Sequence, residues 1–234
     1  MLNDIKKLIG RIQFEANAEV DAQNRAEGMR LAKLLLNYFI GLPEGDRLRC
    51  VKDPSRCITL SLSMLDNSYT LGLYAKKPDV TIVIKPFNQA DMEGEFEKKG
   101  NNNKIRLFLC YSDFENTDEI NEGEFINVFT HEFIHYKKYI TGNYPIQAKD
   151  GADYKSYLSN PDEFDSFSQG IMAELDGLTR TNFKDFNEFL RYTAVIVPFL
   201  KSYLDGSDEK YKKKLISRLY QYYTHKFGGS DEQR

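Results

Sequence analysis

Apolar residues recur every three or four positions at both ends of the chain, which is the spacing of an amphipathic helix. Residues 2–41 carry this pattern up to Gly41 and Pro43, so we expect one bent helix or two helices there. The same spacing returns from about residue 121 onward. Three later helices are expected, one beginning at Pro161 and two spanning about 184–204 and 208–226.

Strand-like alternation of apolar and polar residues fills the region between these helices. Residues 57–64 alternate strictly, and residues 65–68 are typical of a turn. Residues 92–103 are charged and end in glycine and three asparagines, so we expect an exposed and mobile loop there. The strands that the pattern predicts are 57–64, 69–74, 79–87 and 104–111.

Capping signals mark the ends of the helix that follows the strands. Asn121 and Glu124 have the spacing of a capping box, and Gly142 is typical of a position just beyond a helix C-terminus. Apolar residues lie on several faces of this helix, so we expect it to be buried. The next helix has Asn160 as its expected N-cap, followed by proline at the first helical position.

These elements predict an α+β fold that is mostly helical, with a small sheet of about four strands before the helix that begins near residue 121. At 234 residues the chain is long enough for one substantial domain with helical additions. We expect an N-terminal helical segment at 1–45, a core at 46–182, and C-terminal helices packed on that core at 183–234.

Composition and charge exclude several classes of protein. Aromatic residues make up 13% of the chain, which separates it from disordered chains. The net charge of −3 is spread along the sequence without a basic stripe, so no nucleic-acid partner is expected. No run of about 18 apolar residues suggests a membrane span, and the N-terminus lacks the features of a signal peptide. The three cysteines are expected to be free thiols in a reducing compartment, whereas a Cys50–Cys57 disulfide would need an oxidising one.

The candidate chemistry lies in the buried helix, where residues 131–135 read HEFIH. Residues four apart lie on the same helix face, so His131 and His135 can both reach one Zn²⁺ ion at about 2.0–2.1 Å. Glu132 lies about 100° round the helix, where it can take a proton from a water molecule on the metal. The motif therefore predicts a zinc site with Glu132 as general base.

The alternative is a pair of histidines packed among aromatic residues without a metal. Burying a carboxylate and two imidazoles among Phe and Ile is costly without a partner, and a metal would satisfy all three groups. A chance match to this motif is expected only on the order of a few times per thousand such sequences. Both points favour the metal site.

A catalytic zinc site needs a third protein ligand. His225 lies far along the chain, and residues 136–142 hold no histidine, so an HExxHxxGxxH arrangement is ruled out. Two carboxylates remain, those of Glu163 and Glu174, which lie three helical turns apart on one face. Glu163 is the preferred ligand because it lies in the first turn of its helix, although it also fits a capping box with Asn160.

An HExxH helix followed by a glutamate on a later helix resembles the gluzincin branch of the zincin metallopeptidases. In that branch a small residue commonly follows the glutamate three positions on, as Ser166 follows Glu163 here. Residues 104–180 are also similar to small metallopeptidase-like proteins of bacteriophages and bacteria. The resemblance implies a zinc centre in which the ligands are His131, His135 and Glu163 and the general base is Glu132.

The connector between the two helices holds Tyr154 and Tyr157, either of which can supply a phenol that stabilises an oxyanion in peptidases of this type. Their alternative role is packing. In zincin-like folds an edge strand lies along the cleft and can pair with an extended substrate backbone. Residues 104–111 are the expected edge strand.

Together these expectations describe a zinc-dependent metallopeptidase that hydrolyses bonds in a peptide or protein substrate. The alternatives are a catalytically inactive zinc-binding structural or assembly protein, and a metal-free helical interaction module. We expect a cytoplasmic protein, or a virion-associated one if the chain is phage-encoded, with no nucleic-acid or membrane partner.

Overall fold

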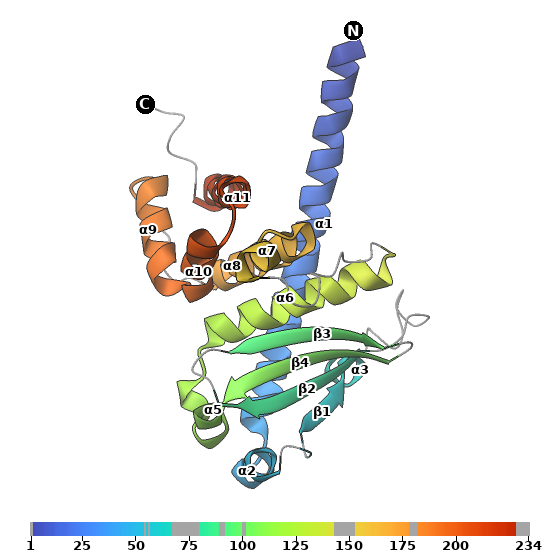
Figure 1. Cartoon of the computed structure of the whole chain (residues 1–234), viewed down its shortest axis with the longest axis vertical. Helices are drawn as coiled ribbons and strands as arrows, with labels where there is room; N and C mark the ends of the chain where they lie inside the picture. Colours follow the sequence, from blue (N-terminus) through green and yellow to red (C-terminus); the bar gives the residue numbers. More distant parts are fainter. Residues whose placement is uncertain are drawn as a thin grey trace.

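The computed structural model describes residues 2–53, 55, 57–66, 80–88, 92–99, 102–142, 153–177 and 182–227. These residues form a mostly helical fold with one four-stranded mixed sheet (Figure 1). The predicted α+β class is thereby confirmed. Among the helices described, none combines the length and the apolar composition that crossing a membrane requires.

Helix, strands and further helices follow one another along the chain in the predicted order. The strands are β1 (Ile58–Ser61), β2 (Val80–Phe87), β3 (Glu93–Lys99) and β4 (Asn102–Cys110). The helices up to the motif helix are α1 (Leu2–Gly41), α2 (Glu44–Lys52), α3 (Leu62–Leu65), α5 (Tyr111–Glu115), the 3₁₀ turn η1 (Thr117–Glu119) and α6 (Glu122–Ile140). The later helices are α7 (Tyr154–Leu158), α8 (Pro161–Asp176), α9 (Phe186–Ile196), α10 (Pro198–Gly206) and α11 (Glu209–Phe227).

The sheet has the strand order β1-β2-β4-β3. β2 and β4 are parallel, whereas β1 pairs with β2, and β3 with β4, in antiparallel fashion. β4 therefore lies inside the sheet and β3 forms an edge. This corrects two predictions, since the strand that holds most of residues 104–111 is not at an edge, and residues 93–99 of the predicted loop at 92–103 form β3. β3 is mostly charged, as edge strands often are, and so lacks the apolar alternation of a half-buried strand.

The first predicted strand, residues 57–64, is shorter than expected. β1 ends at Ser61 and α3 begins at Leu62. Leu62 is fully buried whereas Met64 is 71% exposed, so these two residues do not share a face as strict alternation would require. The predicted hairpin partner at 69–74 lies outside the residues that the structure describes.

Helix α1 is a single helix of 40 residues, so residues 2–41 form one helix and not two. Its C-terminal half is part of the same core as the sheet and α6, where Leu31, Leu35 and Phe39 are fully buried. The N-terminal turns of α1 extend beyond the rest of the molecule, at the top of Figure 1.

The buried apolar side chains form two clusters. The sheet cluster joins α1, the sheet and α6, and the helical cluster joins α7 to α11. The aromatic residues of α6 belong to the sheet cluster, where Phe125, Phe129 and Phe133 are fully buried, so the predicted burial of this helix is observed. Burial of each such side chain contributes roughly 1.5–3 kcal/mol. α8 contributes Phe164 and Ile171 to the helical cluster, so the α6–α8 contact lies between the two cores.

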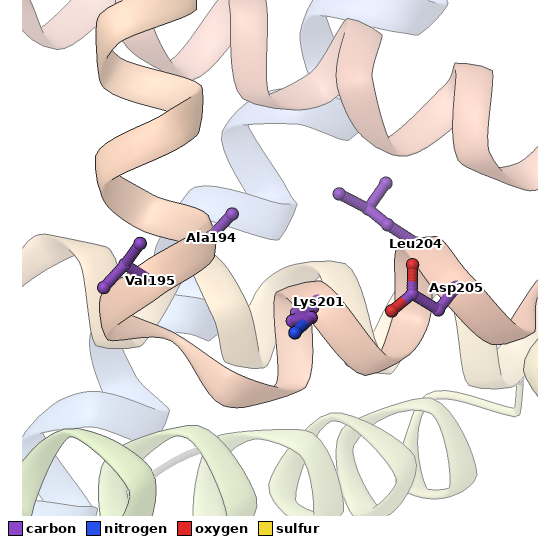
Figure 2. Close-up of a pocket in the computed structure, with 5 residues that line it drawn as sticks. All are labelled: Ala194, Val195, Lys201, Leu204 and Asp205. Carbon is purple, nitrogen blue, oxygen red and sulfur yellow. The ribbon is translucent and has the colours of Figure 1, made fainter.

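The predicted helix at 184–204 is interrupted. α9 ends at Ile196, Val197 is extended with φ −113° and ψ 91°, and Pro198 opens α10. Proline disfavours helical geometry in the residue before it and has no N–H to continue the helix, which explains the break. A hollow of about 580 Å³ lies between α9 and α10 (Figure 2), and its lining includes none of the predicted site residues.

Helices α6 and α8 run antiparallel to each other, as the order of their contacts shows. Lys138, near the end of α6, lies 3.5 Å from the Asp162 carboxylate at the start of α8. Asn127, in the first half of α6, donates a hydrogen bond of 2.7 Å to Glu174 near the end of α8. A Cβ atom at Gly170 would lie 2.8 Å from the backbone oxygen of Asn127, so the missing side chain at this position sets the distance between the helices.

Replacing Gly170 with alanine should therefore push α8 away from α6. The clash with backbone is expected to outweigh the gain in helix propensity and to lower the free energy of unfolding by roughly 1–2 kcal/mol. Urea denaturation measures this change. Gly45→Ala is the matched control, because a Cβ there meets nothing within 4 Å and the substitution should be neutral or mildly stabilising. A Gly170→Ala protein as stable as the wild type would contradict the close crossing.

Candidate metal centre

The HExxH residues lie on a buried face of α6. Asn121 caps this helix, as predicted, by accepting a hydrogen bond from the backbone N–H of Glu124. His131, Glu132 and His135 are only 6%, 6% and 7% exposed. Because the two histidines are one helical turn apart, their rings converge, and their Nε2 atoms are 3.1 Å apart.

Helix α8 brings Glu163 to the two imidazoles. Its Oε2 atom lies 3.3 Å from Nε2 of His131 and 3.4 Å from Nε2 of His135. Asn160 caps α8 by accepting a hydrogen bond from the backbone N–H of Asp162. The cap is thus provided by Asn160, and the Glu163 carboxylate lies against the histidines.

The three atoms form a nearly equilateral triangle with edges of 3.1, 3.3 and 3.4 Å. Ligand atoms around a tetrahedral zinc ion with bonds of about 2.0–2.1 Å are about 3.3–3.4 Å apart. Among the residues described, Glu163 Oε2 and His131 Nδ1 are buried without a hydrogen-bond partner. The spacing and the unsatisfied carboxylate oxygen both fit a bound zinc ion.

Glu132 is a weaker candidate ligand than Glu163. Its carboxylate belongs to a group, with His131 and His135, whose ligand atoms all lie within 4.8 Å of one another. However, Glu132 Oε1 is 3.8 Å from His131 Nε2, whereas Glu163 is closer to both histidines. The distances thus favour Glu163 as the third ligand and leave Glu132 beside the centre.

Burial and charge shift the pKa values of these groups in different directions. Burial raises the pKa of a carboxyl group, yet the two imidazoles outweigh burial at Glu163 and hold its pKa well below the ordinary value. At Glu132 burial dominates and the pKa is raised, with the charge of Glu163 adding to the effect. Burial lowers the pKa of His135, but Glu163 and Glu132 outweigh it and raise that pKa. Two carboxylates in a dry site are a charge arrangement that a divalent cation would neutralise.

The edge strand β3 packs directly against Glu132. The backbone N–H of Phe96 donates a hydrogen bond to the Glu132 carboxylate. The Phe96 ring packs near Tyr136 of α6, with ring centroids 6.2 Å apart. A Cβ atom at Gly94 would lie 2.7 Å from Cγ of Glu132, and glycine within a strand often marks such a close approach. β3 therefore restricts where the Glu132 carboxylate can lie.

Two further side chains of α8 contact the histidines. Ser166, fully buried, places its hydroxyl 3.5 Å from Nδ1 of His135. The Phe167 ring lies edge-on to the His131 ring, with centroids 4.4 Å apart. Both residues are one turn beyond Glu163, so the same face of α8 supplies the carboxylate and supports both imidazoles.

The two predicted tyrosines, Tyr154 and Tyr157, lie in different surroundings. The Tyr157 hydroxyl donates a hydrogen bond to Glu163, and burial together with the nearby charges of Glu163 and Glu132 raises the pKa of this phenol. Tyr154 is 60% exposed and lies against Gly206 of α10. Only Tyr157 is close enough to the centre to take part in its chemistry.

Two other candidates lie away from the centre. Glu174 shares the α6-facing side of α8 with Glu163, as predicted, but it pairs with Asn127 three turns along. His225 is an exposed residue near the end of α11. Glu163 is therefore the carboxylate that the structure brings to the histidines.

Sequence reasoning missed the part of the site that β3 and the helix crossing contribute. Gly94 and Phe96 lie in a segment predicted to be a loop, although its glycine between two glutamates is the signal of a close approach within a strand. Gly170 also has a sequence signal, because a glycine in the middle of an otherwise good helix usually has a packing reason.

Comparison with known proteins gives no match, since no family model, no curated protein and no solved structure is significantly similar to this chain. The interpretation of the centre rests on its own residues and geometry.

Replacing Glu174 with glutamine should change how stability depends on pH. Burial raises the pKa of Glu174 from 4.5 to about 7, with Glu124 adding to the effect and the hydrogen bond from Asn127 opposing it. The folded state therefore favours the protonated form, and this contribution to stability is complete below pH 4.5 and lost as the pH rises toward 7. Glu174→Gln should remove this loss, at most roughly 3 kcal/mol.

The measurement is urea denaturation at several pH values between 4.5 and 8. Glu174→Gln should gain stability over the wild type as the pH rises, whereas replacing the exposed Glu115 with glutamine should leave the two curves parallel. A constant difference between wild type and Glu174→Gln across this range would contradict the raised pKa.

Proposed function

We propose that this chain is a zinc-dependent metallopeptidase of the zincin type, with His131, His135 and Glu163 as metal ligands and Glu132 as general base. The substrate class is a peptide or protein. The observation that carries the proposal is the triangle of two imidazole nitrogens and one carboxylate oxygen, with edges of 3.1–3.4 Å, at the α6–α8 contact.

The surrounding fold supports the same proposal. α6 packs against a mixed sheet, and the antiparallel edge strand β3 lies beside the proposed general base. An edge strand can form main-chain hydrogen bonds with an extended peptide. β3 replaces residues 104–111 as the strand that would pair with a substrate, because β4 has neighbours on both sides.

The chain's own residues account for the proton transfers of hydrolysis. Bound zinc would polarise the scissile carbonyl and lower the pKa of a water molecule to about 7. Glu132 accepts a proton from the attacking water and delivers it to the leaving amine as the carbon–nitrogen bond breaks. Burial raises the pKa of Glu132, which makes it a stronger base than an exposed carboxylate.

Two residues would assist these steps without transferring the proton. The Tyr157 phenol stays protonated because its pKa is raised, and its O–H would turn from Glu163 to the negative charge that develops on the carbonyl oxygen. Ser166 lies at Nδ1 of His135 and would keep Nε2 of that ring directed toward the metal.

Loss of one ligand should abolish stoichiometric zinc. We expect about one zinc ion per wild-type chain, almost none for His135→Ala, and affinity reduced at least about 100-fold for Glu163→Gln. Glu174→Gln should keep wild-type affinity because Glu174 pairs with Asn127. Elemental analysis and competition with a chromogenic chelator measure these values, and wild type purified without zinc that also fails to bind added zinc would refute the metal centre.

Replacing Glu132 with glutamine separates metal binding from catalysis. The variant should bind zinc as the wild type does and lose nearly all peptide cleavage, because the amide cannot accept the proton. The assay combines zinc affinity with cleavage of a fluorogenic peptide library. Cleavage that survives Glu132→Gln would overturn the assigned role.

The burial of the centre favours a second candidate, a zinc-binding structural or assembly protein without hydrolytic activity. His131, Glu132 and His135 are at most 7% exposed, and a structural metal site needs no access for a substrate. This candidate predicts normal zinc binding and no peptide cleavage by either the wild type or Glu132→Gln. A cleaving wild type would exclude it.

A further inference from the structure

We propose that Asp165, held between Lys138 of α6 and Arg218 of α11, positions Glu163 against the two histidines. The inference rests on the proposed metal centre and adds positioning residues to it. It also gives α11, the last of the helices that the structure describes, a part in forming that centre.

The first half of this contact joins the two helices that carry the ligands. Lys138 is one turn beyond His135 on α6, and its Nζ atom lies 2.9 Å from Oδ2 of Asp165. The same ammonium lies 3.4 Å from the backbone oxygen and 3.5 Å from the carboxylate of Asp162. Lys138 therefore contacts α8 on both sides of Glu163 in the sequence.

The second cation that binds Asp165 comes from α11. Arg218 Nη1 lies 2.8 Å from Oδ1 of Asp165, 53 residues away in the sequence, and also donates to the Ser168 hydroxyl. Its guanidinium lies 4.7 Å from the ring centroid of Phe164, the residue after Glu163. Each oxygen of Asp165 is thus bound by a cation from a different helix.

These ion pairs are partly removed from water, which reduces their screening by salt. The side chains of Lys138 and Asp165 are 18% and 23% exposed. Lys138 Nζ and Arg218 Nη1 lie 2.9 and 2.8 Å from the two oxygens of Asp165. Asp21 of α1 faces the same cluster, and burial and the charge of Asp165 raise its pKa.

The cluster of Asp165, Lys138 and Arg218 lies close in sequence and space to the helical turn that carries the proposed metal ligand Glu163. Glu163 is in the first turn of α8, and the first N–H groups of a helix have no partner within it, so this turn frays more easily than the middle. A ligand must be held within about 0.5 Å of its productive position. Fixing Asp165 to two other helices holds the turn that carries Glu163.

The chain contains a matched control in Asp176, at the other end of α8. Its carboxylate also binds cations from two other helices, Arg25 of α1 at 3.2 Å and Lys226 of α11 at 3.0 Å. Its side chain is 24% exposed, nearly the same as that of Asp165. It lies three turns from Asp165 and roughly 20 Å along the helix axis from Glu163, and so is remote from that ligand.

The test compares zinc affinity by chelator competition in Asp165→Asn and Asp176→Asn. We expect about tenfold or greater loss for Asp165→Asn and less than about twofold loss for Asp176→Asn, with similar decreases in the melting temperature of the metal-free proteins. Lys138→Gln should reproduce the loss of affinity, and Lys138→Arg should restore it. Equal affinity losses for the two aspartate variants, or no loss for Asp165→Asn, would overturn the proposal.

Hydrogen–deuterium exchange of the metal-free proteins separates this proposal from the proposed function. Asp165→Asn should speed amide exchange in residues 164–168, whereas Asp176→Asn should leave that segment protected. If Asp165→Asn does not fold, Lys138→Gln and Arg218→Gln take its place in both measurements. A wild type that binds no zinc would refute the proposed function, and unchanged exchange at 164–168 would then refute the positioning role by itself.

Discussion

The contact between α6 and α8 is the constraint on which the rest of the structure depends. The apolar side chains of α6 lie in the sheet cluster and most of those of α8 lie in the helical cluster, and the contact between the two helices buries several polar groups, among them His131, Glu163 and Asn127. Buried polar groups are costly unless they find partners. Asn127 of α6 and Glu174 of α8 satisfy each other, whereas Glu163 Oε2 faces the two imidazoles without a hydrogen bond. Gly170 lets the backbones of α6 and α8 approach closely. Polar groups of the two helices therefore face each other at this contact, which lies between the two apolar clusters and is called the α6–α8 seam below.

Much of this arrangement could be predicted from local patterns. The capping residue Asn121 and the apolar residues on several faces placed α6 correctly, and helical periodicity put His131 and His135 on one face. Periodicity also put Glu163 and Glu174 on a common face of α8, but it could not choose between them. That choice depends on the antiparallel direction of α8 along α6, which is a property of tertiary packing and not of local sequence.

Other parts could not be predicted because their stability comes from distant neighbours. β3 has a charged sequence that is typical of a loop, and it becomes a strand by pairing with β4 and packing Phe96 on α6. The helical pattern of the sequence continues through Val197 and so predicted one helix at 184–204. In the structure the helix ends there, because a proline follows Val197. The ion pairs of Asp165 join residues far apart in the chain, and charge patterns do not identify such pairs.

The placement of the candidate ligands on opposite sides of the seam has a mechanical consequence. The two histidines lie on α6, whose apolar side chains belong to the sheet cluster, and Glu163 lies on α8, most of whose buried apolar side chains belong to the helical cluster. An ion bound by His131, His135 and Glu163 would hold α6 and α8 together, and with them the two apolar clusters. Separating α6 from α8 would release the ion. A ligand that entered between these two helices would therefore cost the centre its ion. Any route for a bulky ligand that keeps the ion in place must therefore leave the α6–α8 seam closed.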